Sequence, residues 1–257
     1  MAAPITAARR RNRGNDGWAF PDLVVETWGD LACFTRPELK SERVSYQMMT
    51  PSAANGFLQA IFWKPQFRYV IRRIEVMKGV RWQQVRRNEV RSVTTASGVR
   101  SMRKEPTQRY DVEEDRDQRN TVALADVRYR IHAQVVVSAE ARAGSDGFPP
   151  ATEEKFREQL RRRVERGACF SQPFFGCREF TASFGPATDR AADQEAKLWT
   201  EELGLMLHSI EYTPSGERYR WFRARVEGGV LEVPRRPLPE SAVVMPEGPW
   251  RAAGTEG

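Results

Sequence analysis

The segment 152–185 joins an arginine-rich helical pattern to an aromatic loop, and both kinds of side chain can bind single-stranded nucleic acid. Phe156, Leu160 and Val164 recur at helical spacing, and cations surround this apolar stripe at Lys155, Arg157, Arg161, Arg162, Arg163 and Arg166. Such cations bind phosphate oxygens, and aromatic rings stack on unpaired bases. A basic amphipathic helix whose charged face only meets solvent is the plainer alternative.

A second group of cations and aromatic residues lies earlier in the chain. Residues 81–109 contain eight lysines or arginines against two glutamates. Six residues in and before this stretch have side chains that can bind phosphate groups or stack on bases, namely Arg43, Trp63, Lys64, Arg86, Arg87 and Asn88. A solvated run of charge is the alternative interpretation here too.

The residues that usually hold metals or act as nucleophiles are sparse. Three cysteines (Cys33, Cys169 and Cys177) form no CxxC pair, and His132 and His208 are the two histidines. We therefore predict no metal site and no cofactor, and the sequence has no Walker loop, dinucleotide fingerprint, HExxH or GxSxG. Free thiols fit a reducing cytoplasm. We expect Cys177 to be a small buried thiol and both histidines to be structural.

The overall charge indicates an anionic partner. The net charge is +7 with a pI near 9.6, which favours nucleic acid first and a membrane surface second. No apolar run approaches the length of a membrane span, so we expect no membrane insertion. Residues 1–20 are expected to form a disordered basic arm, although the first 15 could also pass for an organelle transit peptide.

The elements that must position these residues follow the order β-α-β-β-α-β. The patterns predict strands at 22–34, 67–78, 121–139 and 181–184, and helices at 50–63 and 152–167. This order indicates an α+β, ferredoxin-like fold, in which two helices back a four-stranded antiparallel sheet. RNA-recognition domains share this arrangement.

The remaining stretches are less regular. Residues 81–109 show no periodicity, which predicts a mobile basic loop or an irregular hairpin. Strands at 203–212, 219–226 and 230–233 indicate a small antiparallel extension. The expected domains are therefore the arm at 1–20, the ferredoxin-like domain at 21–187, the β extension at 188–236 and a proline-rich tail at 237–257.

Six motifs, in order from about residue 23 to residue 234, resemble the Cas-five family of CRISPR proteins, subtype d, the variety found in subtype I-C Cascade. They are TWGDLACFTRPE at 27–38, ERVSY at 42–46, TPSAA at 50–54, WKP at 63–65, RRNEV at 86–90 and FGCREF at 175–180. The resemblance implies RNA contacts at Arg43, Trp63, Lys64, Arg86, Arg87, Asn88 and Arg178, and at Arg157 and Arg161 of the arginine-rich helical pattern.

This resemblance implies a function in antiviral defence. Members of the family cut precursor CRISPR RNA within the repeat and stay on the 5′ handle beside the backbone and large subunits of Cascade. The cut needs no metal, because the 2′-hydroxyl attacks its own phosphodiester and leaves a 2′,3′-cyclic phosphate. The site then needs a base, an acid and a cation that stabilises the developing charge.

The sequence departs from the family at two of the three catalytic positions that the resemblance implies. The family's tyrosine falls at Phe62, and its Lys-His pair falls at Lys155 and Phe156, so that Lys155 alone is kept. Tyr46 is a candidate substitute, since it lies on a predicted loop beside Arg43, although an ordinary loop tyrosine is an equal alternative. A non-catalytic RNA-binding subunit that caps the 5′ handle is the competing function. A basic RNA-binding domain outside CRISPR systems would require the motifs to be coincidental.

Overall fold

The computed structural model describes residues 17–243 except for 40, 106, 108 and 145–148. Most of the predicted basic arm and the end of the proline-rich tail therefore lie outside the described residues. Nine strands of the described chain form one sheet: β1 (Leu23–Ala32), β2 (Arg43–Val44), β3 (Phe67–Val76), β4 (Trp82–Val90), β5 (Arg116–Val137), β6 (Ser183–Pro186), β7 (Glu201–Thr213), β8 (Gly216–Glu227) and β9 (Val230–Glu232).

Five helices and one short 3-10 turn complete the described chain. They are α1 (Pro51–Ile61), α2 (Ala96–Lys104), α3 (Ala139–Ala143), α4 (Glu153–Arg166), α5 (Gln194–Leu198) and the turn Glu240–Ala242. The two long helices of the body, α1 and α4, confirm the predicted helices. The short helices α3 and α5 and the exposed helix α2 were not predicted.

The chain begins and ends α1 through local signals. The Thr50 hydroxyl accepts a hydrogen bond from the Ala53 amide at 3.1 Å, and Pro51 occupies the first turn, where its missing N–H costs nothing. The helix buries Ala54, Phe57, Leu58 and Ile61. It ends at Phe62, whose extended backbone leads into the exposed motif at 63–65.

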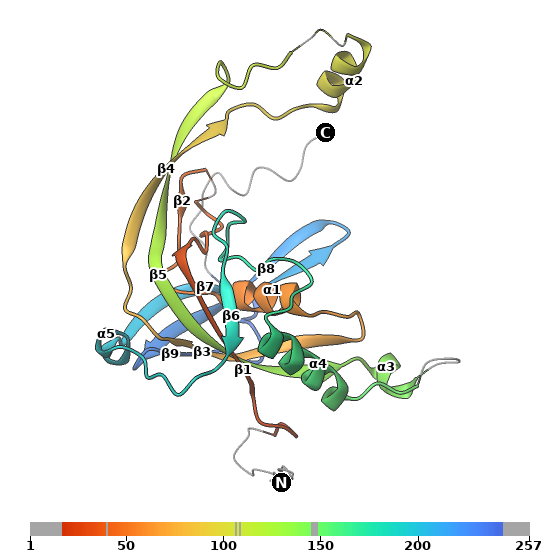
Figure 1. Ribbon diagram of the computed structural model, residues 1–257, viewed down its shortest axis with the longest axis vertical. Helices are drawn as coiled ribbons and strands as arrows, with labels where there is room; N and C mark the ends of the chain where they lie inside the picture. The colour runs from red at the N-terminus through yellow and green to blue at the C-terminus, as the bar shows by residue number, and fades with distance from the viewer. Residues whose placement is uncertain (1–16, 40, 106, 108, 145–148, 244–257) are drawn as a thin grey trace, which may run out of the picture.

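Helix α4 also follows the predicted pattern. Thr152 caps its first turn, and Gly167 ends it with a φ of +63°, a conformation that glycine adopts without strain. The apolar stripe faces the core as predicted, with Phe156, Leu160 and Val164 all buried. Helices α1 and α4 contact each other and lie against the sheet (Figure 1).

The sheet is mostly antiparallel, and its path runs β6-β1-β5-β3-β9-β8-β7. The first four strands of this path are the predicted strands, with α1 connecting β1 to β3 and α4 preceding β6. The predicted C-terminal strands continue the same sheet, because β9 pairs with both β3 and β8. Helix α1 contacts β7 as well as β3, so the sheet curls around this helix.

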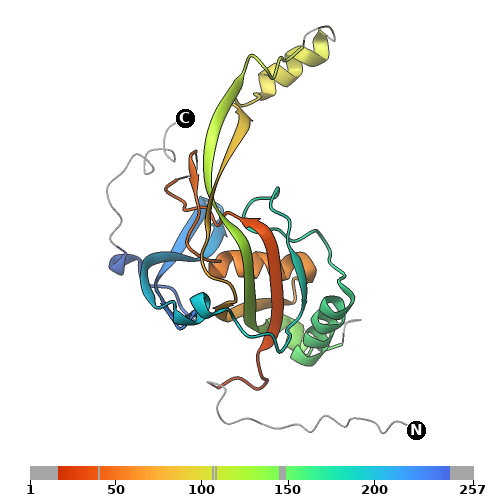
Figure 2. The same ribbon diagram turned by 60° about the vertical axis from the view of Figure 1, so that its left-hand side comes forward.

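Residues 81–109 do not form the mobile loop that was one of the two predictions. The other prediction, an irregular hairpin, was closer, but the pairing is regular. Residues 82–90 pair in regular register with the first part of β5, from Trp82 opposite Leu124 to Val90 opposite Arg116. This two-stranded ribbon, hereafter the ribbon, rises away from the body and carries α2 at its end (Figures 1 and 2). Apolar alternation is weak because one face of the ribbon is exposed and the other is half-buried and carries mainly charged side chains.

The two ends of the described chain are packed against the body. Trp18 lies under Arg72 and Arg235, with guanidinium carbons 5.9 and 4.6 Å from its ring centre. The amide of Leu238 donates to the Trp221 carbonyl at 2.8 Å. Residues 17–20 and 237–243 thus belong to the folded body. In the part of the chain that the structure describes, no helix is long and apolar enough to cross a membrane.

Candidate nucleic-acid interface

Four buried aromatic residues, hereafter the aromatic cluster, occupy the space between the end of α1 and the start of α4. They are Phe62, Phe67, Tyr69 and Phe156. The rings of Phe67 and Phe156 stack with centroids 4.6 Å apart, and those of Phe62 and Phe67 stack at 5.4 Å. Tyr69 donates from its hydroxyl to the Phe62 carbonyl at 2.7 Å. The cluster fixes the junction between the two helices.

The two substituted positions therefore lie side by side, with ring centroids 6.4 Å apart. Phe62 is 2% exposed and Phe156 is 3% exposed. Hydrocarbon rings at this depth stabilise the core and supply no proton donor or acceptor. The buried environment agrees with the apolar periodicity of α4 and gives Phe156 a structural role.

Three predicted site residues surround the cluster on the surface. Trp63, which is half exposed, and Lys64 follow Phe62 directly, and Lys155 extends from the first turn of α4. Arg163, from a later turn of α4, places its guanidinium carbon 5.3 Å from the Phe62 ring centre and donates to the Ile61 carbonyl at 3.0 Å. The sequence indicated Arg163 only as one cation of the charged helix face, because its contact with Phe62 depends on the crossing of the two helices.

The expectation that Arg157 binds RNA was wrong. Its side chain is buried, and it donates to the Gln134 side chain at 2.9 Å and to the Pro21 carbonyl. Phe20 covers the guanidinium at 5.1 Å, and burial lowers the pKa of Arg157 to about 10. This arginine joins α4 to β5 and to the segment before β1.

Tyr46 lies outside helices and strands, as predicted, but its burial argues against the catalytic role considered for it. The residue is 1% exposed, and Arg36 lies over its ring at 4.5 Å. Burial raises the pKa of Tyr46 well above its usual value of 10. A phenol that is inaccessible and held neutral is poorly placed to take a proton from RNA.

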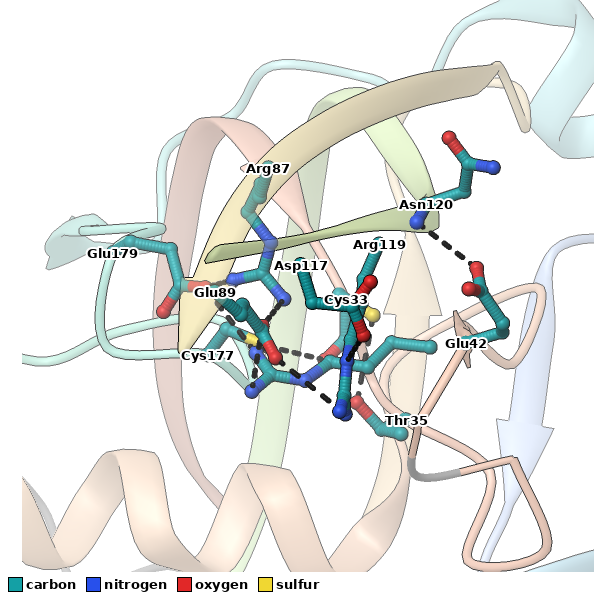
Figure 3. A network of polar contacts seen from close by, with 11 residues as sticks. Cys33, Thr35, Glu42, Arg87, Glu89, Asp117, Arg119, Asn120, Cys177 and Glu179 are labelled. Carbon is teal, nitrogen blue, oxygen red and sulfur yellow. Dashed lines mark hydrogen bonds and ion pairs between the residues drawn. The ribbon is translucent and has the colours of Figure 1, made fainter. Parts of the chain in front are cut away.

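Arg87 belongs to a polar network at the base of the ribbon (Figure 3). Arg43 joins this network through its ion pairs. Arg87 donates to Glu89 at 2.9 Å and pairs with Glu179, and Arg43 lies 3.5 Å from Glu89 and 3.3 Å from Glu179. These contacts tie β4 to the loop at 175–180. The sequence revealed the arginines but not the glutamates that neutralise them, since Glu179 is distant in the chain.

The same network contains two buried thiols. The Arg43 guanidinium donates to the Cys177 sulfur at 3.4 Å, and the Cys33 thiol lies 3.4 Å from the Thr35 hydroxyl. A hydrogen bond from Cys33, together with the charge of Arg43, lowers the pKa of Cys177. Gly176 is required between these loops, because a Cβ there would lie 1.9 Å from the Cys33 carbonyl oxygen. The predicted burial of Cys177 is confirmed.

Arg86 and Asn88 point to the other face of the ribbon and are exposed. Their exposure leaves the Arg86 guanidinium and the Asn88 amide accessible to a ligand. Arg178 is exposed beside the network, and Arg161 is exposed on α4, where it pairs with Glu158. The structure therefore divides the predicted RNA contacts into accessible and structural residues.

The two histidines lie away from the cluster. His132 is buried in β5 with Nε2 2.9 Å from a Glu75 carboxylate oxygen, and His208 has its ring nitrogens near the Ser209 hydroxyl and the Pro234 carbonyl. Both have the structural surroundings predicted for them. No group of three or more His, Cys, Asp or Glu side chains within the described residues is arranged to hold a metal ion.

The chain resembles known proteins over most of its length. The model of the family described as CRISPR-associated protein (Cas_Cas5), subtype Cas5d, matches residues 22–234. A protein of Mannheimia succiniciproducens named CRISPR pre-crRNA endoribonuclease Cas5d is 42% identical over 82% of this chain and 94% of its own length. A Thermus thermophilus protein of the same name is 36% identical over 82% of this chain and 91% of its own length.

Solved structures share the fold at lower identity. A structure described as a CRISPR-associated protein has a TM-score of 0.58 and 21% identity over 83% of this chain and 91% of its own. A functionally uncharacterized protein from Streptococcus mutans has a TM-score of 0.58 and 20% identity over 87% and 95% of the two chains. The family match and the two relatives show that the chain belongs to the Cas5 family of CRISPR-associated proteins, subtype d.

Proposed function

We propose that this protein is a CRISPR endoribonuclease that cuts precursor CRISPR RNA in the repeat and remains on the 5′ handle as a Cascade subunit. The observation that carries the proposal is its 42% identity, across nearly the whole relative, to a protein named pre-crRNA endoribonuclease. The exposed Lys155 beside the aromatic cluster supports the same function, since a cation is available where the resemblance implies a cleavage site.

The proposed chemistry uses the RNA as its own nucleophile. The 2′-hydroxyl attacks the adjacent phosphorus, the bond to the 5′-oxygen breaks, and a 2′,3′-cyclic phosphate is left. Lys155 stabilises the negative charge that develops on the phosphorane, helped by the positive end of α4. Phe62 and Phe156 cannot transfer protons, so we assign neither base nor acid to a side chain. Because two family groups are replaced, we expect slow cutting.

The proposed RNA path uses the accessible residues. Trp63, Lys64 and Lys155 lie around the cluster, and Arg86, Asn88, Arg161 and Arg178 are exposed on neighbouring elements. We also propose that β6-β1-β5-β3 with α1 and α4 is a ferredoxin-like unit, which the strand order supports. The strands after residue 187 then form its C-terminal extension.

A non-catalytic subunit that caps the 5′ handle is the second candidate. The burial of Phe62 and Phe156 as core residues favours it, because the proton-transfer groups implied by the family are absent.

The test is incubation of the purified protein with its own repeat RNA in EDTA. We expect a product with a cyclic phosphate end, and no product when a 2′-deoxynucleotide precedes the cut. Cleavage that requires Mg²⁺, or that survives the deoxy substitution, would contradict the mechanism. Tight repeat binding without any cleavage would establish the capping function instead.

A further inference from the structure

Phe170 is the most exposed aromatic side chain among the described residues. It is 85% exposed, compared with 50% for Trp63. Leaving a whole phenylalanine ring in water forgoes the favourable free energy of burying it. Either a ligand covers the ring, or the backbone prevents the ring from packing against the body.

The backbone that carries Phe170 is firmly held. Its amide donates to the Ala60 carbonyl at 2.9 Å and to the Ile61 carbonyl at 3.2 Å, and the Ser171 amide donates to the Ala60 carbonyl at 3.0 Å. These bonds satisfy carbonyls at the end of α1 that the helix leaves unpaired. Residues 168–171 thus bridge the ends of α1 and α4, and the exposed position of the ring is built into the fold.

The surface around this ring is mostly cationic. Arg163 and Arg166 lie in the last turn of α4, and Arg163 contacts both the Ile61 carbonyl and the Phe62 ring. Arg162 is exposed in the preceding turn, and Glu165 is the acidic side chain of this region. Ser171 and Gln172, which follow the ring, are exposed and polar. A lone ring among cations suits an anionic, base-bearing ligand better than an apolar protein surface.

We infer that Phe170 stacks on an unpaired nucleobase of the repeat RNA, while the arginines at the end of α4 contact its phosphates. This inference rests on the proposed function and adds a binding site to it. Trp63 follows the same end of α1, so the two rings flank the aromatic cluster. Lys155 and Arg166 are separated by about 16 Å of helix, which places the stacked base several nucleotides from the cut. The site therefore orients the strand rather than touching the reacting atoms.

The direct test is photocrosslinking of the full-length protein to its repeat RNA with 5-iodouridine placed singly along the unpaired nucleotides. We expect one position to crosslink to Phe170, identified by mass spectrometry of the digested complex. Phe170→Ala should abolish that crosslink and weaken repeat binding by about tenfold or more, the loss expected for one base stack. Thermal unfolding should stay unchanged, because the exposed ring contributes no core contact.

Three variants separate aromatic stacking from simple apolar contact. Phe170→Tyr should bind like the parent, whereas Phe170→Leu should bind like Phe170→Ala. Tyr212→Ala, which removes another largely exposed ring from the β7–β8 hairpin, should bind normally. A Leu variant equal to the parent would overturn the stacking role.

The outcomes also distinguish this inference from the proposed function. If the parent binds its repeat RNA and Phe170→Ala retains full affinity, the stacking site is wrong while the function stands. If the parent neither binds nor cuts the repeat, the proposed function fails. If Phe170→Ala leaves RNA binding intact but prevents assembly with another Cascade subunit, the ring is a protein contact and the inference is overturned.

Discussion

At the scale of residues, burial separates side chains that look alike in the sequence. Arg157 and Arg161 are one helical turn apart on α4, yet Arg157 is 2% exposed and bonded to Gln134, whereas Arg161 is exposed and pairs only within its helix. Phe156 and Lys155 are neighbours with opposite orientations. Only some of the charged and aromatic side chains are therefore exposed and able to contact RNA.

Lys155 gives the residue-scale prediction. Lys155→Ala should reduce single-turnover cleavage of the repeat by about a hundredfold, as expected when a charge-stabilising contact is lost from a transition state. Repeat binding should remain within about tenfold, because one phosphate contact contributes little of the total affinity. Lys155→Arg keeps the positive charge and should retain most of the rate. Normal cutting by the Ala variant would remove Lys155 from the site.

At the scale of elements, ion pairs at the base of the ribbon hold it against the body. Arg43 and Arg87 are held by Glu89 and Glu179, so they join β2 and β4 to the loop at 175–180. Figure 3 shows Arg87 with both glutamates. Arg86 faces the other way on the same strand. Because side chains alternate between the two faces of a strand, Arg86 is exposed whereas Arg87 forms ion pairs.

The element-scale prediction compares these two arginines. Arg86→Ala should reduce the slope of log affinity against log salt by about one unit, the loss of roughly one phosphate contact. Arg87→Ala should leave this slope unchanged but lower the unfolding temperature, because it breaks the ion pairs at the ribbon base. Salt titrations of repeat binding and thermal melts of both variants make the comparison. An equal loss of slope in both variants would contradict this division.

Local signals predicted the regular elements well, whereas the site depended on contacts across the fold. Thr50, Pro51, Thr152 and Gly167 marked the helix ends correctly, because capping is decided by nearby residues. The regular pairing of the ribbon was missed, since its strands lack a buried apolar face and hence lack apolar alternation. The burial of Tyr46 was missed because the residues that cover it come from distant parts of the chain.

At the scale of the molecule, the face of the sheet that carries Glu26 holds a buried charged network. Glu26 on β1 is fully buried and accepts from Arg128 at 2.6 Å, from Arg130 at 3.1 Å and from the Thr188 amide at 3.1 Å. Arg130 also donates to the carbonyls of Thr188 and Arg190. This network fastens the segment after β6 across β1 and β5, so the C-terminal strands start from a fixed point.

Glu26 accordingly links the stability of the whole chain to pH. Burial alone would raise its pKa, but the hydrogen bonds from Thr188, Arg128 and Arg130 outweigh burial and lower it from the usual 4.5. A carboxyl whose pKa is lower in the folded state stabilises the fold above its unfolded pKa, and this contribution is lost as pH falls through the folded value. The parent should therefore lose stability as the pH drops below about 4.5, in the range where Glu26 is protonated.

Glu26→Gln tests this linkage, because the amide matches the carboxyl in size but cannot carry its charge. At pH 7 the variant should be less stable by about 3 kcal/mol, since the half-buried Arg128 and Arg130 lose the charge of the buried Glu26. The difference should narrow in acid, where the parent's own carboxyl becomes protonated. Urea denaturation at pH 7 and below pH 4 measures both values, with Glu240→Gln as a surface control expected to change stability by less than about 1 kcal/mol. A destabilisation that stays constant across this pH range would show that the amide disturbs packing, and that the Glu26 charge contributes nothing to stability.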